Sequence, residues 1–266
     1  MTWAKTWDNI LQGGPTRWKV DDVDIKKRAL AFIHKYMNIE SSSFHPINQN
    51  DSHHNNNNNV GEGSKNSSLK ILCPLAGDDL FVTTAWREGH DVTAIDLVPA
   101  AVDTMQRQFG GSEQDWTTTT TTEPPQGSSS DSASKTTAIW KHKSGRATLY
   151  AGDMMQERPE WNGKFDVIYD KDSFGALPLE LRSKYCERLA EYCKSNQDNA
   201  IVYIEVKRKL SGGKESGGPP FHVEEEDLME PRNFGTHFEY MTSLGEVYPL
   251  PNMSSMKQTG HILKRK

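Results

Sequence analysis

A glycine and a carboxylate stand at a spacing that is typical of nucleotide-binding sites. Gly77 closes the turn Pro74-Leu75-Ala76-Gly77, and Asp96 follows this glycine 19 residues later. A carboxylate at about this distance can accept hydrogen bonds from both hydroxyls of a ribose, and a glycine lets a ligand approach the backbone closely. The pair predicts an adenosine-binding site. The alternative interpretation is that Asp96 only caps the helix that follows it.

The residues around the turn favour one class of cofactor over another. A dinucleotide site needs three close glycines to seat a pyrophosphate on a helix N-terminus, whereas here one glycine is followed by Asp78 and Asp79. Carboxylates repel a pyrophosphate but tolerate the positive charge of a sulfonium, and Asp153, after a later predicted strand, fits the same pattern. S-adenosyl-L-methionine is therefore favoured over a nicotinamide dinucleotide.

Short apolar runs alternate with helical patterns around these residues. Strands are expected over 69–72, 92–95, 147–150, 165–169 and 200–206, helices up to about 88 and over 98–109, 179–194 and 224–229, and a terminal hairpin from 238–241 and 261–263. This order predicts an α/β fold with a doubly wound, mostly parallel sheet, helices on both faces and an antiparallel C-terminal hairpin. Ligands of such sheets bind beyond the carboxyl ends of the strands, where Gly77, Asp96 and Asp153 stand.

Two low-complexity segments lower the hydrophobic fraction of the 266 residues to 35%. One covers residues 40–68 and contains Asn55 to Asn59, and the other covers 111–138 and contains Thr117 to Thr122. Neither can bury enough apolar surface to offset chain entropy, so both are expected to be disordered surface loops inserted in a single domain spanning 1–266. The paired His53 and His54 lie in such a loop without rigid surroundings, so no metal site is expected.

Charge and composition exclude several classes of partner and location. The net charge of −5 and the absence of a long basic stripe argue against nucleic acid. The longest apolar run, Ala200 to Ile204, is far too short to span a membrane, and no signal-peptide pattern opens the chain. Three cysteines without a paired motif suit a reducing compartment. We expect a cytoplasmic monomer with a core large enough to fold alone.

Five ordered blocks of the sequence resemble the thiopurine S-methyltransferase family of class I methyltransferases. The blocks are Trp3-x-x-x-Trp7, Pro74-Leu75-Ala76-Gly77, Gly89-His90 leading to Ala94-Ile95-Asp96-Leu97, Gly163-Lys164-Phe165-Asp166-Val167-Ile168-Tyr169-Asp170, and Gly218-Pro219-Pro220-Phe221-x-Val223. The resemblance implies a seven-stranded, Rossmann-like sheet. It also implies methyl transfer from S-adenosyl-L-methionine to the sulfur of a small-molecule thiol or to a related soft nucleophile.

The resemblance also implies roles for single residues. Carried over position by position, Trp3 would pack on the cofactor and Leu75 would line its amino-acid end. Asp96 would bind the ribose, Leu97 would touch the adenine and Asp153 would lie beside it. The alternative interpretation of Trp3 is that, with Trp7 at helical spacing, it fastens the N-terminal segment to the core.

The candidate catalytic residues are Asp170 and Lys171. Lys171 falls where many family members have an arginine next to the substrate. The run from Asp170 to Leu177 is two residues longer than the family form, so the alignment of Lys171 with that arginine stays open. A thiol must lose its proton before methyl transfer, and either side chain could assist through water or by stabilising the thiolate. The alternatives are a helix cap or loop salt bridge for Asp170 and a solvated side chain for Lys171.

Other functions share this pattern of residues. The plant-type thiol and halide methyltransferases have the same fold and resemble the chain almost as well, so a halide, bisulfide or selenium methyltransferase is the alternative enzyme. A non-catalytic protein that binds S-adenosylmethionine is the alternative of another class, because the region around Lys171 departs from the family. The segment Pro219-Pro220-Phe221 is expected to belong to a loop that covers the substrate.

Overall fold

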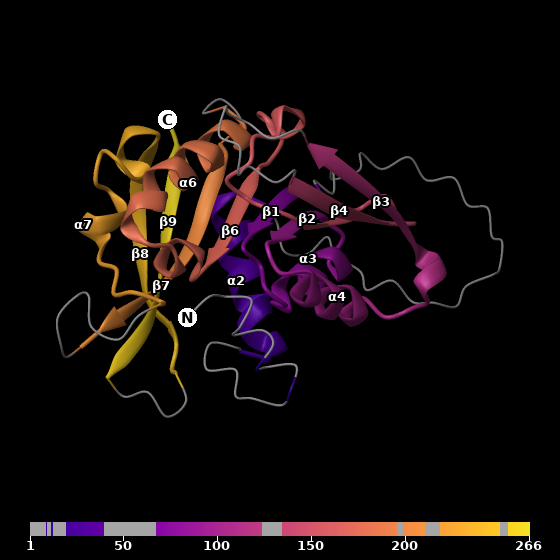
Figure 1. The fold of residues 1–266 in the computed structure, drawn as a ribbon. Coiled ribbons are helices and arrows are strands. Elements are labelled where there is room, and N and C mark those ends of the chain that lie inside the picture. Colours follow the sequence, from indigo (N-terminus) through magenta and orange to yellow (C-terminus); the bar gives the residue numbers. More distant parts are fainter. Residues whose placement is uncertain are drawn as a thin grey trace, which may run out of the picture.

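One nine-stranded sheet forms the centre of the described chain (Figure 1). The computed structural model describes residues 20–39, 68–123, 135–195, 199–210, 219–250 and 255–266, together with Asn9 and Gln12. In chain order the strands are β1 (Lys70–Pro74), β2 (Asp91–Asp96), β3 (Trp116–Glu123), β4 (Lys135–His142), β5 (Ala147–Ala151), β6 (Val167–Lys171), β7 (Ile201–Lys209), β8 (Phe238–Tyr248) and β9 (Met256–Arg265). In space they run β3-β4-β5-β2-β1-β6-β7-β9-β8.

The middle of the sheet is parallel and its two ends are antiparallel. β5, β2, β1, β6 and β7 pair in parallel, β9 pairs antiparallel with β7, and β8 pairs antiparallel with β9. These seven strands form the predicted doubly wound sheet with its C-terminal hairpin. The apolar runs at 69–72 and 200–206 become β1 and β7, whose middle residues are buried on both sides, as a central parallel strand requires.

Helices cover both faces of the sheet. One hydrophobic cluster packs α2 (Val23–Tyr36), α3 (Phe81–Arg87) and α4 (Pro99–Gln108) against one face. A second cluster packs α5 (Ser173–Ala176), α6 (Leu179–Tyr192) and α7 (Glu225–Leu228) against the other. Residues of β1 alternate between the two clusters, with Ile71 and Cys73 in the first and Leu72 in the second. Among the described residues, the short 3-10 helices η2 (Glu113–Asp115), η3 (Pro159–Trp161) and η5 (Phe234–Thr236) lie in the connections.

The second low-complexity segment contains two strands, so the expectation of a disordered loop over 111–138 is wrong for residues 116–123 and 135–138. β3 pairs antiparallel with β4, and β4 continues the sheet by pairing antiparallel with β5. Threonine is β-branched and favours extended backbone, so a run of threonines suits an edge strand. Trp116 also anchors β3, because its ring packs edge-on against the ring of Phe109 at the C-terminus of α4. The two ring centres lie 5.1 Å apart. Residues 40–67 lie outside the described residues.

No helix within the described ranges is long and apolar enough to cross a membrane.

Candidate functional site

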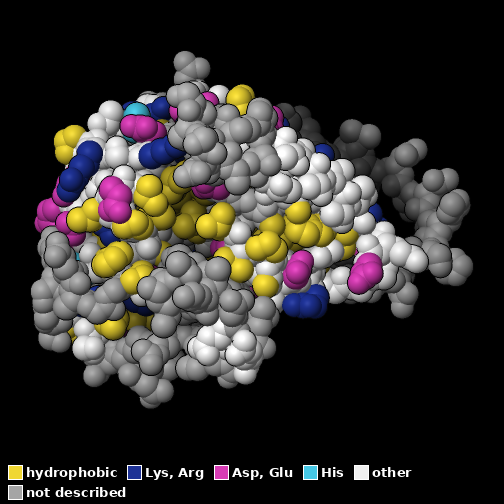
Figure 2. Space-filling model, in the orientation of Figure 1, with side chains coloured by type: hydrophobic (Ala, Val, Ile, Leu, Met, Phe, Trp, Pro, Cys, Tyr) yellow, Lys and Arg dark blue, Asp and Glu magenta, His cyan; other side chains and the backbone are white. Residues whose placement is uncertain are grey.

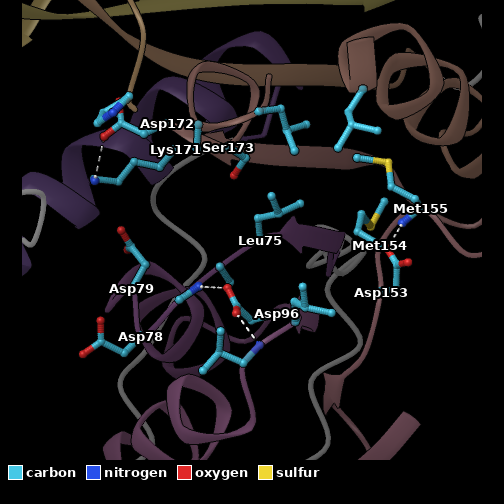
Figure 3. Close-up of a pocket in the computed structure, with 18 of the residues that line it drawn as sticks. Leu75, Asp78, Asp79, Asp96, Asp153, Met154, Met155, Lys171, Asp172 and Ser173 are labelled. Carbon is cyan, nitrogen blue, oxygen red and sulfur yellow. Dashed lines mark hydrogen bonds and ion pairs between the residues drawn. The ribbon is translucent and has the colours of Figure 1, made fainter. Parts of the chain in front are cut away.

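A cavity of about 280 Å³ opens beyond the carboxyl ends of β1, β2, β5 and β6 (Figure 3). This is the position at which doubly wound sheets bind their ligands. Figure 2 shows a band of apolar side chains across the middle of the face that it draws. Leu97 and Leu181, which line the cavity, are among the exposed large hydrophobic residues, with exposed fractions of 65% and 38%. The cavity therefore combines apolar walls with the polar groups described next.

Asp96 ends β2 and faces the cavity. One of its carboxylate oxygens accepts a hydrogen bond from the backbone N–H of Gly77 at 2.8 Å, and the other accepts one from Val98 at 2.9 Å. Burial raises the pKa of Asp96, while these backbone N–H groups oppose the shift. Each oxygen keeps a second lone pair, so the carboxylate is fixed in place and can still accept two hydroxyls. Asp96 therefore holds the turn after β1 in place and also faces the space in which a ligand would bind.

One end of the cavity is apolar and contains most of the predicted cofactor residues. Leu75 and Gly77 both have positive φ, 45° and 57°, and so turn the chain sharply after β1. Leu97 and Asp153 line the same cavity, and Asp153 accepts a hydrogen bond from the backbone N–H of Met155 at 2.8 Å. The structure thus brings Leu75, Gly77, Asp96, Leu97 and Asp153 together. Trp3 lies outside the described residues.

Two methionines that the sequence reading missed complete this apolar end. Met154 and Met155 follow β5 and line the cavity beside Asp153 (Figure 3). Their position directly after a predicted strand, next to a carboxylate already singled out, is the signal that could have identified them. Flexible thioether side chains make favourable contacts with aromatic rings. The pair therefore offers a surface that suits a planar ring.

The opposite end of the cavity contains Lys171, Asp172 and Ser173, which end β6 and begin α5 (Figure 3). The ammonium of Lys171 lies 3.3 Å from the carboxylate of Asp172, and its side chain is only 7% exposed. Burial opposes the charged form, yet the carboxylates of Asp172, Asp79 and Glu205 raise the pKa of Lys171 above its usual value. Lys171 is therefore a protonated, paired cation at the cavity wall rather than a solvated side chain.

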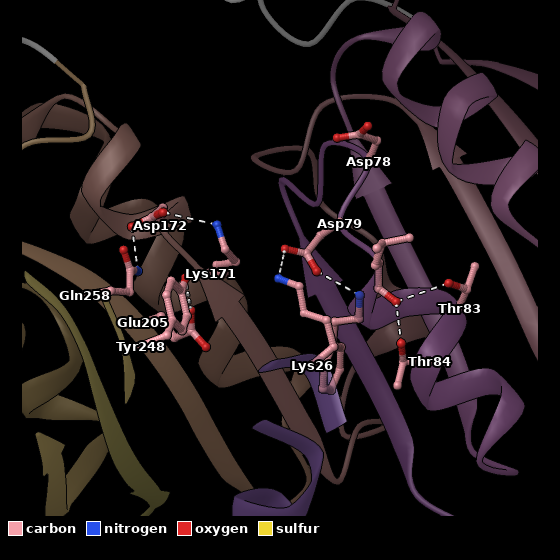
Figure 4. A network of polar contacts seen from close by, with 12 residues as sticks. Lys26, Asp78, Asp79, Thr83, Thr84, Lys171, Asp172, Glu205, Tyr248 and Gln258 are labelled. Carbon is pink, nitrogen blue, oxygen red and sulfur yellow. Dashed lines mark hydrogen bonds and ion pairs between the residues drawn. The ribbon is translucent and has the colours of Figure 1, made fainter. Parts of the chain in front are cut away.

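Asp172 holds Lys171 through a buried polar network that reaches β7 and β9 (Figure 4). Asp172 has a left-handed backbone with φ of 61° and accepts hydrogen bonds from Lys207 at 2.8 Å and from Gln258 at 3.0 Å. Burial favours its neutral form, but the ammonium groups of Lys207 and Lys171 hold the pKa of Asp172 at about 2. The carboxylate stays charged and fixes the turn after β6.

Asp170 does not line the cavity. Its side chain is fully buried and accepts hydrogen bonds from the backbone N–H groups of Ser173 at 2.9 Å and Phe174 at 3.2 Å, and from the hydroxyl of Tyr185 at 2.8 Å. Burial raises the pKa of Asp170 to about 7. These are the contacts of a residue that caps the first turn of α5, which was the alternative interpretation of this position.

Lys26 of α2 supplies a further contact that the sequence reading missed. Its ammonium is fully buried and lies 2.7 Å from the carboxylate of Asp79 at the cavity wall, and Asp79 also accepts the backbone N–H of Phe81 at 2.8 Å (Figure 4). A lysine at helical spacing from Ala29, Leu30 and Ile33, all buried, is the signal that could have revealed it. The ion pair fastens α2 to the turn that follows β1.

Comparisons with a family model and with curated proteins both match the thiopurine S-methyltransferase family. The sequence model of the thiopurine S-methyltransferase family matches residues 42–246. A curated protein named thiopurine S-methyltransferase from Methylococcus capsulatus is 28% identical over 166 residues, which are 62% of this chain. Another of the same name from Pseudomonas putida is 26% identical over 161 residues, which are 60% of this chain. Each match spans 64% of the length of the relative.

A solved structure shares the fold. It is the 1,6-didemethyltoxoflavin-N1-methyltransferase of Burkholderia thailandensis with bound 1,6-didemethyltoxoflavin and S-adenosylhomocysteine. The superposition covers 99% of this chain and 84% of that one with a TM-score of 0.54 and 13% sequence identity. At this identity the likeness shows the class I methyltransferase fold and nothing finer.

Proposed function

The chain belongs to the thiopurine S-methyltransferase family, and from this premise we propose that it transfers a methyl group from S-adenosylmethionine to the sulfur of a small-molecule thiol. The family name supports the thiol acceptor, and the observation that carries the cofactor part of the proposal is the charge of the cavity wall around Asp96. Asp78, Asp79 and Asp153 line the same cavity, and Lys171 is the one basic residue among its described lining residues. Such a wall repels a pyrophosphate and favours a sulfonium cation.

The residues present fit S-adenosylmethionine. Asp96 would accept the ribose hydroxyls, as its two fixed oxygens allow. The adenine would lie at the apolar end, where Leu97, Val98, Met154 and Met155 are available to hold it. The amino-acid part would lie at the turn from Leu75 to Gly77. When bound, the cofactor supplies a methyl group that is already strongly electrophilic, so the protein needs no elaborate acid–base chemistry.

The chain itself would orient the acceptor and exclude water. Leu177, Pro178, Leu181 and Pro220 also line the cavity, so an acceptor bound in it would meet apolar side chains. This placement lowers the entropy cost of the displacement and removes water from the nucleophile. Once the thiol has released its proton to solvent, the ammonium of Lys171 would stabilise the thiolate. Asp170 is given no catalytic part, because it caps α5 behind the cavity.

Titration calorimetry with S-adenosylhomocysteine tests the cofactor part of the proposal, with NADH as the control ligand. Micromolar binding of S-adenosylhomocysteine and no binding of NADH is the expected result. Binding of NADH, or of neither ligand, would contradict the proposal.

Turnover with thiols, selenide and iodide then separates the alternatives. A preference for iodide indicates a halide methyltransferase. Binding of S-adenosylhomocysteine without any turnover indicates a non-catalytic protein.

A further inference from the structure

A second, much smaller cavity of about 10 Å³ lies behind the Lys171 end of the main cavity. Its lining residues are Cys73, Pro74, Ala76, Asp79, Val82, Tyr169, Lys171 and Ser173. Ala76, Asp79, Lys171 and Ser173 line the main cavity as well, so the two spaces share a wall. The volume is at the lower end of what one buried water molecule needs.

The hydroxyl of Tyr169 is the unusual group in this small cavity. Its oxygen is buried and has no hydrogen-bond partner in the part of the chain that the structure describes. The ring cannot turn away easily, because it stacks on Phe81 with the ring centres 3.6 Å apart and on Tyr203 with the centres 5.6 Å apart. By contrast, the neighbouring hydroxyls of Tyr203 and Tyr248 both donate to Glu205 at 2.8 Å. A buried hydroxyl without a partner is costly, so a small ligand is expected beside it.

We propose that the small cavity binds one water molecule, which accepts the hydrogen bond of the Tyr169 hydroxyl and joins it to Asp79 and Lys171. A water molecule bound there finds a complementary set of groups. It can accept from Tyr169 and from the ammonium of Lys171, and it can donate to the carboxylate of Asp79. Ser173 offers a further acceptor, because its own hydroxyl proton is directed to the carbonyl of Pro74 at 2.8 Å.

Through this water, Tyr169 becomes a positioning residue for Lys171. The positioning role rests on the proposed function. The existence of the water site does not depend on that function. Asp172 holds the Lys171 ammonium on one side at 3.3 Å. The water holds it on the side of Asp79 and Tyr169, so the ammonium stays at the wall of the acceptor end. Asp96, Leu97 and Asp153 do not line the small cavity, so loss of the water should leave cofactor binding intact.

Two variants remove the water by different means. Tyr169→Phe deletes the hydroxyl, and Val82→Ile keeps the hydroxyl but adds a methyl group to the cavity wall. High-resolution crystal structures are expected to show a water within hydrogen-bonding distance of Tyr169 Oη in the unaltered protein and none at that place in either variant. Both variants should raise the KM for the thiol by about 3- to 10-fold, the equivalent of one hydrogen bond, and leave the Kd of S-adenosylhomocysteine unchanged.

Matched controls separate this effect from a general loss of packing. Tyr192→Phe removes a buried hydroxyl that accepts from the Arg158 backbone at 3.0 Å, and Val92→Ile adds a methyl group to another buried position in β2. Both should leave the KM unchanged. A crystal structure of the unaltered protein with no water beside Tyr169 Oη would overturn the site. An unchanged KM in both cavity variants would overturn the positioning role. A protein that shows the water but never turns over contradicts the proposed function and still supports the site.

Discussion

Asp96 shows how one side chain can both shape a cavity and face it. Asp96→Ala removes the hydrogen bonds that the carboxylate would make to the ribose, so the affinity for S-adenosylhomocysteine should fall by about 1.5–3 kcal/mol. Titration calorimetry measures the change. Asp91→Ala, at the start of the same strand and far from the cavity, is the control and should bind normally. Equal affinities in the two variants would contradict the assignment of Asp96.

Asp170 makes stability depend on pH in a direction that can be tested. Its folded-state pKa of about 7 lies above the value of an unfolded aspartate, so its contribution is present at low pH and is lost as the pH rises through about 7. Asp170→Asn keeps an acceptor for the backbone of Ser173 and Phe174 but does not titrate. Between about pH 5 and 8, the unfolding free energy of the unaltered protein should fall relative to that of the variant. A constant difference in urea denaturation across this range would refute the role.

At the residue scale, the positions of residues along the sequence were enough to identify some of the side chains that line the cavity, but not all of them. The turn and the strand end place Gly77 and Asp96 in the cavity, because both lie at the carboxyl edge of the sheet. Asp170 and Lys171 are adjacent in β6, and neighbouring residues of a strand point to opposite faces. Lys171 lines the cavity and Asp170 does not, and the sequence did not show which of the two would do so. The partners of Tyr169 and Lys26 depend on side chains that are distant in sequence, so no local pattern predicts them.

At the scale of elements, the ion pair between Lys26 and Asp79 should be essential for docking α2. The ammonium is fully buried and the carboxylate is 13% exposed, so Lys26→Met leaves a largely buried charge without its partner. The loss should be about 3–5 kcal/mol in urea denaturation. Adding Asp79→Asn should restore part of the stability, because the unpaired charge is then gone. The exposed Lys27→Met on the same helix is the control, and an equal loss there would contradict the interpretation.

A buried histidine pair joins α2 to the residue that precedes β2 and should make the protein sensitive to acid. The Nε2 atoms of His34 and His90 lie 2.8 Å apart, and His90 Nδ1 accepts the backbone N–H of Leu69. Burial lowers the pKa of both rings, that of His90 to about 3. The unfolded chain takes up these protons at a higher pH than the folded chain, so unfolding becomes easier as the pH falls from about 7 towards 4. His90→Asn should flatten this dependence and His237→Asn should not, as measured by urea denaturation at each pH.

The elements were largely predictable where the apolar period was regular. The buried runs of β1, β2 and β7 and the helical spacing of α4 and α6 agree with the predicted segments to within a few residues. The β3–β4 hairpin was missed because a threonine run has low complexity, although its residues favour strands. Its pairing with β5 is a contact formed in three dimensions, which the run itself does not encode.

At the scale of the whole molecule, topology brings the separate signals into one site. The parallel order of β5, β2, β1 and β6 collects the residues that follow four strands at a single edge of the sheet. The same edge receives α2 through Lys26 and the C-terminal strands through Gln258. A sequence reading could predict the edge from the alternation of strands and helices. It could not predict the buried network that sets the charge of Lys171, because that network joins residues from α2, β6, β7 and β9.

The most direct test of the account is transfer of a labelled methyl group. The purified protein is incubated with S-adenosylmethionine carrying ¹³C in its methyl group and with a panel of aromatic and aliphatic thiols, and the products are read by NMR. We expect a labelled methyl thioether from at least one thiol, formed more slowly by Asp96→Ala. No labelled thioether from any thiol, in a protein that binds S-adenosylhomocysteine, would contradict the proposed S-methyltransferase activity.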